Sequence, residues 1–399
     1  MTHRQTLHFL TCGHVDDGKS TLIGRLLYDI GAVPDDQVQG AMVDGKVDYS
    51  RLTDGLEDER AQGITIDVAY RFFRYGGRHY RIADTPGHVQ YVRNMAVAAA
   101  NSDCALILVD ATHGVREQTL RHSKIALFFG IRHFIIAVNK MDLAGYDESR
   151  FNKIQESYRD GLGEIPDVTL TFIPVSAING DNLSASSMNM PWYRGPNLLE
   201  YLAEVEVPAP PTSSVRLPVQ STIRLEEKRG YHGVLGGGNL QAGDVLHVAD
   251  TSMPITISEI YHGGRATARA LPGQAITVVP AEEVDLSRGN VLYGASAPVR
   301  YADAFTAALL WLDPAFAQLE TVPAIIKIHH CEEQAEAQIK VLRDPIAEAQ
   351  IFTASPIPMD AYSTHRATGL FLLIQPETEK VIAVGTVQSL QGKEWNFSI

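Results

Sequence analysis

Residues 13–20 constrain this chain more than any other stretch. They read Gly-His-Val-Asp-Asp-Gly-Lys-Ser and match G-x-x-x-x-G-K-S/T, a loop that holds nucleotide phosphates. Gly13 and Gly18 let the backbone turn tightly, so that successive N–H groups can point at phosphate oxygens. Lys19 offers a cation to the β- and γ-phosphates, and Ser20 offers a hydroxyl to Mg²⁺. The loop predicts a nucleotide site near the N-terminus.

The residues around this loop have the pattern that such a site requires. Residues 8–12, His-Phe-Leu-Thr-Cys, predict a short buried strand before the loop. Apolar residues at helical spacing follow the loop, with a glycine as a stop: Leu22, Ile23, Leu26, Leu27, Ile30 and Gly31. The N-terminus of this helix would therefore face the anion.

Composition limits the class of protein. A length of 399 residues predicts two or three domains, at roughly 150 residues each. The net charge of −13 argues against a nucleic-acid partner, because phosphate binding usually leaves a basic footprint. The three cysteines are odd in number and far apart, which favours buried thiols in a reducing cytoplasm. No run approaches the roughly 20 apolar residues that span a bilayer, and no N-terminal signal is visible. We therefore expect a cytoplasmic protein.

Residues 7–206 alternate strand and helix patterns, which indicates an α/β domain with a mostly parallel sheet. Residues 34–63 interrupt this alternation. They are polar, lack hydrophobic periodicity and predict a long functional loop, which ends just before Thr65. Residues 68–83 then predict a β-hairpin that turns at Gly76 and Gly77.

The returning strand of this hairpin runs into Asp84-Thr85-Pro86-Gly87-His88. An acidic residue at a strand end, followed by a turn with glycine, suits a water-bridged Mg²⁺ ligand and an N–H aimed at a γ-phosphate. Taken alone, this pattern is weak, and an ordinary surface turn explains it better.

Two more motifs follow strand-like runs. Residues 104–109 form a continuous apolar run ending at Asp110, and residues 133–138 form another that leads into Asn139-Lys140-Met141-Asp142. Asp142 can accept hydrogen bonds from guanine N1–H and N2–H₂, a donor pair that adenine lacks. Such a difference can discriminate by roughly 10⁴-fold. Asn139 can bond the base edge or tie the surrounding loops together.

A helix predicted from residues 151–158, with Asp147 as its N-cap, leads to the last element of this series. Residues 172–175 predict a strand that ends at Ser176-Ala177, whose backbone N–H groups could contact guanine O6.

Five elements thus follow one another: the phosphate loop, Thr65 after the long loop, Asp84 to His88, Asn139 to Asp142, and Ser176-Ala177. In this order they resemble the GTP-binding domain of translation-factor GTPases, the elongation factor Tu superfamily. Within it, the chain is most similar to the GTPase (large) subunit family of bacterial sulfate adenylyltransferase. Three stretches carry this resemblance: residues 15–27, residues 63–73, and residues 180–182 with 190–200. Translation factors usually have histidine where Asp17 stands.

The resemblance implies GTP or GDP and Mg²⁺ as ligands. It assigns nucleotide binding to Gly13, His14, Val15, Asp16, Asp17, Gly18, Lys19, Ser20, Thr21, Asp84, Gly87, Asn139, Lys140, Asp142, Ser176 and Ala177. It gives Mg²⁺ to Ser20, Thr65 and Asp84. It gives hydrolysis to Lys19, Thr65 and His88, with His88 orienting the attacking water.

The same resemblance implies a GTP-hydrolysing regulatory subunit of a heteromeric sulfate adenylyltransferase. GTP hydrolysis would drive formation of adenylyl sulfate and pyrophosphate from ATP and sulfate. A separate small catalytic subunit would carry the adenylyl transfer, because this chain has no Ser-Gly-Gly-x-Asp-Ser loop. The chain has no second phosphate loop, so the sequence predicts no fused adenylylsulfate kinase. Two alternatives stay open: a translation-factor-like GTPase that binds tRNA, and a divergent GTPase switch that serves another partner.

The second half has a different pattern. Residues 207–214 are rich in proline and predict a linker between a GTP-binding domain (1–206) and a β-barrel domain (215–299). Short strands and glycine turns recur there, including a strand over residues 217–224. By analogy, residues 300–399 form a second, shortened β-barrel, whose middle (344–359) is hard to assign. The adjacent His329, His330 and Cys331 do not indicate a metal site, because neighbours on a strand point to opposite faces.

Overall fold

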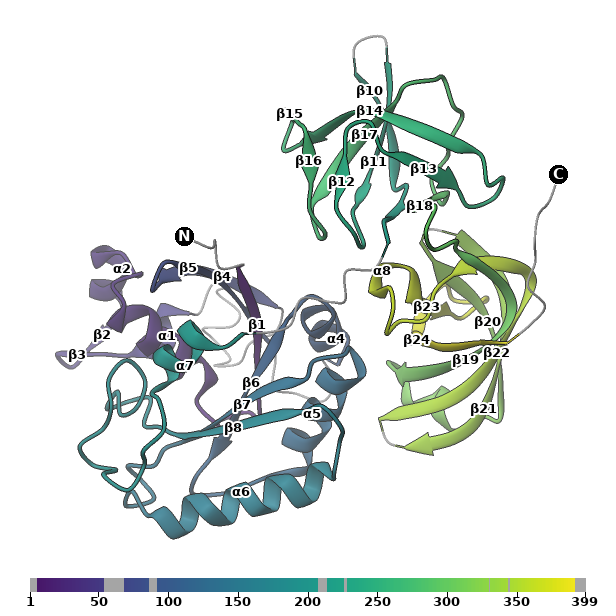
Figure 1. Cartoon of the computed structure of the whole chain (residues 1–399). Coiled ribbons are helices and arrows are strands. Elements are labelled where there is room, and N and C mark those ends of the chain that lie inside the picture. The colour runs from purple at the N-terminus through teal and green to yellow at the C-terminus, as the bar shows by residue number, and fades with distance from the viewer. Residues whose placement is uncertain are drawn as a thin grey trace. The chain divides into compact units, whose positions relative to one another are not determined.

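The structure is a computed structural model, and Figure 1 shows the whole chain. It describes residues 6–53, 68–85, 92–206, 214–225, 228–329, 331–343 and 345–391. Thr65, Gly87 and His88 lie outside these ranges, as does most of the predicted linker. The chain divides into two compact units, Met1–Val207 and Pro208–Ile399.

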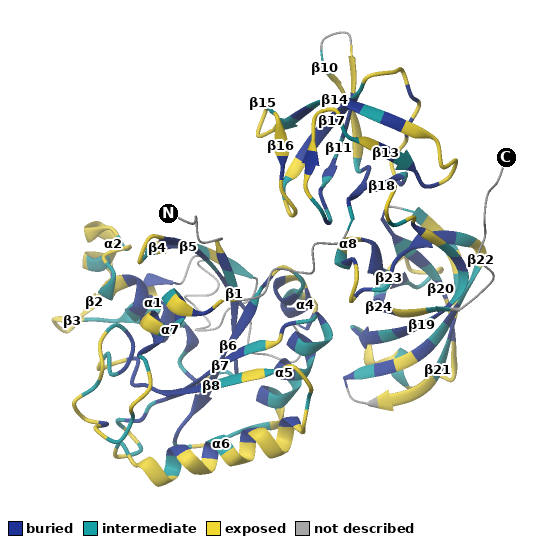
Figure 2. Cartoon of the chain, viewed as in Figure 1, coloured by how far each residue is buried: buried dark blue, intermediate teal, exposed yellow. Residues whose placement is uncertain are grey.

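The N-terminal unit is built on a six-stranded sheet in the order β4-β5-β1-β6-β7-β8. The strands are β1 (Leu7–Cys12), β4 (Ala69–Tyr75), β5 (Arg78–Asp84), β6 (Cys104–Asp110), β7 (His133–Asn139) and β8 (Thr169–Pro174). Only β4 is antiparallel to its neighbour, so the predicted mostly parallel sheet is confirmed. Every residue of β6 is buried, as expected for an apolar strand covered on both faces (Figure 2).

The helices of this unit include those that the sequence predicts after the phosphate loop and over residues 151–158. They are α1 (Lys19–Asp29), α2 (Asp35–Gly40), α4 (Val92–Ala100), α5 (Glu117–Phe128), α6 (Glu148–Leu162) and α7 (Leu198–Glu204). Asp147 caps α6 by accepting a hydrogen bond from the Ser149 N–H, as predicted. α7 begins with a reciprocal capping box between Asn197 and Glu200.

The prediction of a long loop over residues 34–63 was wrong for its first part. Residues 35–52 contain α2, the short strands β2 (Met42–Val43) and β3 (Lys46–Val47), and the 3₁₀ helix η1 (Tyr49–Leu52). η1 lies against α1 at Gly24, where a Cβ atom would stand 1.8 Å from the Tyr49 carbonyl oxygen. This packing, rather than local periodicity, orders the segment.

The predicted hairpin is confirmed. β4 and β5 pair from Ala69–Asp84 to Tyr75–Arg78. Gly76 and Gly77, with φ of 57° and 77°, form a turn that other residues adopt only with strain.

The C-terminal unit begins with an eight-stranded sheet in the order β10-β11-β17-β14-β13-β18-β9, with β15 paired to β14. Its strands are β9 (Arg216–Pro218), β10 (Ser221–Leu225), β11 (Lys228–Val234), β13 (Val245–Val248), β14 (Pro254–His262), β15 (Arg265–Thr267), β17 (Ala275–Pro280) and β18 (Val291–Gly294). β12 (Leu240–Gln241) and β16 (Arg269–Ala270) form a separate pair. The Gly236 N–H donates to the Arg216 carbonyl at 2.7 Å, which brings β9 close to β11.

The prediction of one strand over residues 217–224 was wrong, because the chain changes partners there. β9 pairs with β18, whereas β10 pairs with β11. At the break, the Val219 N–H donates to the Asn290 carbonyl and the Gln220 N–H donates to the His232 carbonyl, each at 2.8 Å.

A closed six-stranded barrel, β19-β22-β21-β20-β23-β24, completes the unit. Its strands are β19 (Arg300–Trp311), β20 (Thr321–Ile328), β21 (Cys331–Arg343), β22 (Ile346–Met359), β23 (Leu370–Ile374) and β24 (Val381–Gln391). The short helices η3 (Pro314–Gln318) and α8 (Arg366–Gly369) connect them. Most of the segment 344–359, which the sequence left unassigned, is β22, paired with β19 and β21.

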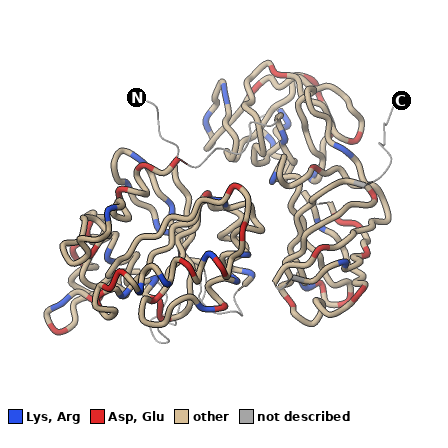
Figure 3. Tube along the Cα trace, turned by 60° about the horizontal axis from the view of Figure 1, so that its bottom comes forward, with Lys and Arg blue, Asp and Glu red and all other residues tan. Residues whose placement is uncertain are grey.

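Acidic residues occur along both units with basic residues between them (Figure 3). Cys12 and Cys104 are buried, as predicted, and burial raises the pKa of the Cys12 thiol to about 12. Among the residues that the structure describes, no helix has the length and apolar character needed to cross a membrane.

Candidate functional site

The loop between β1 and α1 needs both of its glycines. A Cβ atom at Gly13 would lie 2.8 Å from the Leu108 carbonyl oxygen. Gly18 has a φ of +89°, and a Cβ atom there would lie 2.6 Å from Nδ2 of Asn139. Neighbouring strands therefore hold the loop too closely for any side chain at these two positions. Asp16 adopts a φ of 71° and is exposed at the tip of the loop.

Asp17 closes the loop from inside. Its side chain is buried, and its Oδ2 accepts a hydrogen bond from the His14 N–H at 2.7 Å. Burial raises the pKa of Asp17, although this hydrogen bond and the charge of Lys19 oppose the shift. The sequence singled out Asp17 by its identity alone; in the structure it fixes the backbone of the loop.

Asn139 joins three segments that are far apart in the sequence. Its Nδ2 donates to the Asp17 carbonyl at 2.8 Å, and its Oδ1 accepts from the Ala177 N–H at 3.0 Å. The side chain is only 2% exposed. Of the two roles left open for Asn139, these bonds favour tying the loops together.

Asp142 lies beside Ser176 at the same edge of the sheet. The Ser176 hydroxyl donates to Oδ1 of Asp142 at 2.7 Å, which orients the carboxylate. The backbone N–H groups of Ser176 and Ala177 donate to the Asp181 carbonyl at 3.2 Å and to Asn139. A contact with guanine O6 would therefore have to share or replace one of these two bonds.

Lys19 and Asp84 occupy the phosphate side. Lys19 Nζ donates to the His14 carbonyl at 2.9 Å, and burial lowers its pKa while the charge of Asp84 opposes the shift. Asp84 is buried at the end of β5, where its Oδ1 accepts from the Thr11 hydroxyl at 2.8 Å. A cation and a carboxylate thus lie at the carboxyl ends of adjacent parallel strands.

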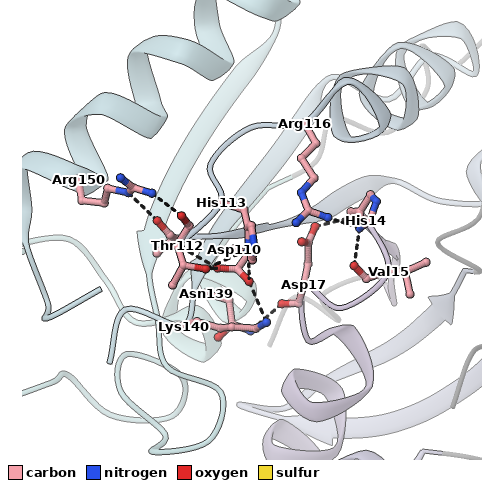
Figure 4. Close-up of polar contacts among 11 residues, drawn as sticks. His14, Val15, Asp17, Asp110, Thr112, His113, Arg116, Asn139, Lys140 and Arg150 are labelled. Atoms are coloured by element: carbon pink, nitrogen blue, oxygen red, sulfur yellow. Dashed lines mark hydrogen bonds and ion pairs between the residues drawn. The ribbon is translucent and has the colours of Figure 1, made fainter. Parts of the chain in front are cut away.

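Lys140 has a partner that the sequence did not predict. Its Nζ lies 2.8 Å from Oδ2 of Asp110, at the end of the neighbouring strand (Figure 4). Burial alone would raise the pKa of Asp110, but hydrogen bonds from Lys140 and Thr112 hold it well below its usual range. This ion pair fastens the residue after β7 to the last residue of β6.

Two arginines near the site were also missed. Nη1 of Arg116 lies 2.6 Å from Nδ1 of His14 in the phosphate loop (Figure 4). Arg25 in α1 donates from Nη1 to the Ile178 carbonyl at 2.6 Å, and its guanidinium lies 4.9 Å from the ring centroid of Tyr49. No spacing rule could have found either contact, because the partners are far apart in the chain.

The remaining predicted residues divide into two groups. Val15, Ser20 and Thr21 lie half-buried on the phosphate loop and the first turn of α1. Thr65, Gly87 and His88 lie outside the described residues. The structure therefore brings the following residues together at the carboxyl ends of the parallel strands: the phosphate loop, Asp84, Asn139, Asp142, Ser176 and Ala177.

Comparisons with known proteins show the family of this chain. The family model for the elongation factor Tu GTP binding domain matches residues 4–209. The chain is 38% identical to sulfate adenylyltransferase subunit 1 of Saccharophagus degradans, over 96% of this chain and 87% of that protein. It is 40% identical to the bifunctional enzyme NodQ of Rhizobium sp., over 96% of this chain but only 63% of the length of NodQ.

Among solved structures, the chain resembles the bacterial selenocysteine-specific elongation factor EF-Sec, with a TM-score of 0.51 and 19% identity. That match covers 96% of this chain and 58% of EF-Sec, and it shows a shared fold. The prediction was a phosphate-loop GTPase domain followed by two β-barrels. The GTPase domain and the second barrel are confirmed, and the region between them is β-rich, with an eight-stranded sheet. The chain belongs to the elongation factor Tu GTP-binding domain family and, within it, to the family of sulfate adenylyltransferase subunit 1.

Proposed function

We propose that this chain is the GTP-hydrolysing regulatory subunit of a two-chain sulfate adenylyltransferase in the cytoplasm. GTP hydrolysis on this chain would drive formation of adenylyl sulfate and pyrophosphate by a separate small catalytic subunit. The observation that carries the GTPase assignment is Asn139, which joins the phosphate loop to the Ser176–Ala177 loop, where Ser176 orients Asp142. The relatives named sulfate adenylyltransferase subunit 1 support the choice of reaction.

The arrangement of the site supports nucleotide binding. Residues 13–21 would surround the phosphates, with the N-terminus of α1 and Lys19 facing negative charge. Asp142 would accept the two guanine donors on the opposite side of Asn139. One hydrogen-bonded frame would thus hold both ends of the nucleotide.

Oxygen donors at the phosphate side fit Mg²⁺, which prefers carboxylate and hydroxyl ligands. Ser20 stands in the first turn of α1, and the buried Asp84 carboxylate is oriented by Thr11. We assign the ion to Ser20, Thr65 and Asp84. When bound, it would neutralise charge on the β- and γ-phosphates.

Hydrolysis needs a group that orients water, and we assign that role to His88, with the Gly87 N–H facing the γ-phosphate. The two nucleotide states would differ in contacts made by Thr65 and Gly87, and this difference would reach the partner subunit.

The test is a reconstituted assay of adenylyl sulfate formation with the small subunit, ATP and sulfate, with and without GTP. We expect GTP to raise product formation in the wild type. His88→Ala should abolish most of this stimulation and reduce GTP turnover by roughly 10²-fold or more, with GTP binding retained. His262→Ala, exposed on β14, is the matched control.

The outcomes separate the alternatives. Unchanged turnover in His88→Ala would remove His88 from the mechanism. If GTP had no effect on product formation, the sulfate reaction would be excluded and a GTPase serving another partner would remain. Salt-sensitive binding of tRNA would instead favour a translation-factor role.

A further inference from the structure

β4 forms one edge of the six-stranded sheet, and among the strands that the structure describes it pairs with β5 alone. A strand with one neighbour leaves a row of backbone N–H and C=O groups open to another strand. Edge strands are commonly protected by short length or by proline, but β4 has seven residues and no proline. Its backbone can therefore accept an additional strand.

The two faces of β4 differ sharply in exposure. Phe73, on the inner face, is buried and stacks on Tyr80 with ring centroids 4.5 Å apart. On the outer face, Phe72 is 72% exposed and Tyr70 is 39% exposed. Two aromatic rings at positions i and i+2 make a continuous apolar surface, and aromatic residues are enriched where proteins bind one another.

Basic side chains surround these rings. Arg81 on β5 is the cross-strand partner of Phe72, and its guanidinium lies 5.5 Å from the ring centroid of Tyr70. Arg74 follows on the same outer face, and its Nε lies 2.8 Å from Nε2 of His79. A cationic surface on a chain with a net charge of −13 favours an acidic partner.

The Asp103 carboxylate lies near this surface, on the side of β1. His8 on β1 pairs in register with Arg81, and the His8 N–H donates to Oδ2 of Asp103 at 2.9 Å. That bond engages one oxygen of the Asp103 carboxylate.

We propose that the outer face of the β4–β5 hairpin, formed by Tyr70, Phe72, Arg74, His79 and Arg81, docks an extended acidic segment of the small catalytic subunit. The segment adds a strand along β4, seats an apolar side chain against Phe72 and places carboxylates beside the two arginines. This inference rests on the proposed function, which supplies the identity of the partner. The hairpin lies between Thr65 and Gly87 in the sequence, and its second strand ends at Asp84, which we assign to the magnesium ion.

Titration of the full chain with the purified small subunit tests the proposal. Phe72→Ser removes the exposed ring and should raise Kd by about tenfold or more, as loss of a central interface residue does. Arg74→Glu should also raise Kd, and its effect should shrink at high ionic strength because salt screens exposed charges. Leu143→Ser, at another exposed apolar residue, and Lys153→Glu, at an exposed cation on α6, are the matched controls and should bind as the wild type does.

GTP turnover of the uncomplexed variants should equal that of the wild type, which shows that the nucleotide site is intact. If the wild type binds the small subunit and both hairpin variants bind equally well, the docking proposal is overturned and the proposed function stands. If the wild type does not bind the small subunit, both fail. Loss of binding to a single-stranded oligonucleotide, with the small subunit unaffected, would overturn the proposal in favour of a nucleic-acid surface.

Discussion

At the residue scale, Ser176 sets the orientation of Asp142. A carboxylate can accept hydrogen bonds at both oxygens, so the bond from Ser176 to Oδ1 leaves acceptor capacity for the two guanine donors. An amide in place of the carboxylate would present a donor to those donors instead.

We therefore expect Asp142→Asn to lose GTP affinity and gain affinity for xanthosine triphosphate, whose base carries a carbonyl where guanine has an amino group. Two hydrogen bonds to a charged group are worth about 1.5–3 kcal/mol each, so the loss should be roughly 100-fold or more. Equilibrium titration with both nucleotides measures the ratio, and Asp160→Asn, exposed on α6, is the control. An unchanged nucleotide preference would show that Asp142 does not read the base.

Arg25 on α1 supports the loop that follows Ser176. Its Nε forms an ion pair with Oδ1 of Asp29 at 2.7 Å, while Nη1 donates to Ile178. Asp29 in turn accepts from the Ser184 hydroxyl at 2.8 Å. The planar guanidinium thus serves two partners at once, which a lysine ammonium on a flexible stem does not reproduce.

Arg25→Lys should weaken GTP and GDP binding to the same extent, by about three- to tenfold, because the loop beyond Ser176 loses its support in both nucleotide states. Fluorescence titration with each nucleotide measures this change. The control is Arg159→Lys on α6. The wild-type Arg159 guanidinium lies 5.0 Å from the ring centroid of Phe172 on β8. Equal losses in both variants would mean that the effect does not pass through the loop after Ser176.

At the scale of elements, the contact between α1 and η1 orders a segment that its own sequence leaves undefined. Gly24 removes the side chain where the two helices meet, and Tyr28 and Tyr49 pack edge to face beside it at 5.4 Å. Asp48 caps η1 by accepting from the Ser50 N–H. The segment leading toward Thr65 is therefore anchored to the helix that begins at the phosphate loop.

Gly24→Ala should break this contact, because the new methyl group would lie 1.8 Å from the Tyr49 carbonyl. Overpacking of this kind costs about 1–3 kcal/mol, which thermal unfolding should detect. Gly40→Ala at the end of α2 is the matched control, since a Cβ atom there meets nothing within 4 Å. The same melting temperature for Gly24→Ala and the wild type would contradict this account of the contact.

At the scale of the whole molecule, a buried ion pair connects the two β regions of the C-terminal unit. Arg216 on β9 is 1% exposed, and its Nε and Nη2 lie 2.8 and 3.0 Å from the two carboxylate oxygens of Asp360, just after β22. The Thr368 hydroxyl donates to the same carboxylate at 2.6 Å. Burial alone would raise the pKa of Asp360, but these partners outweigh it and lower the pKa.

A lowered pKa means that the pair stabilises the folded state above the unfolded pKa of about 3.9, and that this stability is lost as pH falls through the folded pKa. Asp360→Asn should destabilise the unit at neutral pH by about 3–5 kcal/mol, since it leaves Arg216 buried without its counter-charge. The variant should also lose less of its unfolding free energy than the wild type as the pH is lowered, because the carboxylate that titrates is gone. Calorimetric unfolding of the full chain as a function of pH measures both effects.

Replacing both partners by apolar residues, as in Arg216→Met with Asp360→Leu, should recover much of the stability, because no charge is then left buried. Arg229→Ala, at an ion pair with an exposed Asp285, is the control for charge removal at the surface. If Asp360→Asn unfolded as the wild type does at neutral pH, the pair would not hold the two regions together.

Local sequence was sufficient to predict most of the elements. The strands around the phosphate loop and the helices α1 and α6 follow from apolar runs and helical spacing, which depend on neighbouring residues. The predictions were wrong where a distant segment of the chain determines the local structure. β9 and β10 separate because they pair with different strands, and residues 35–52 fold because Gly24 admits η1.

The sequence by itself determined the phosphate loop and the order of the residues that we propose to read the nucleotide, because residue type and spacing along the chain specify backbone turns and strand ends. Only the tertiary structure decided which distant partners the side chains of the site and of the C-terminal unit contact. Asn139 ties loops, Lys140 pairs with Asp110, and Arg216 pairs with Asp360. Each of these is a contact between distant parts of the chain, whose geometry exists only after the sheets have assembled.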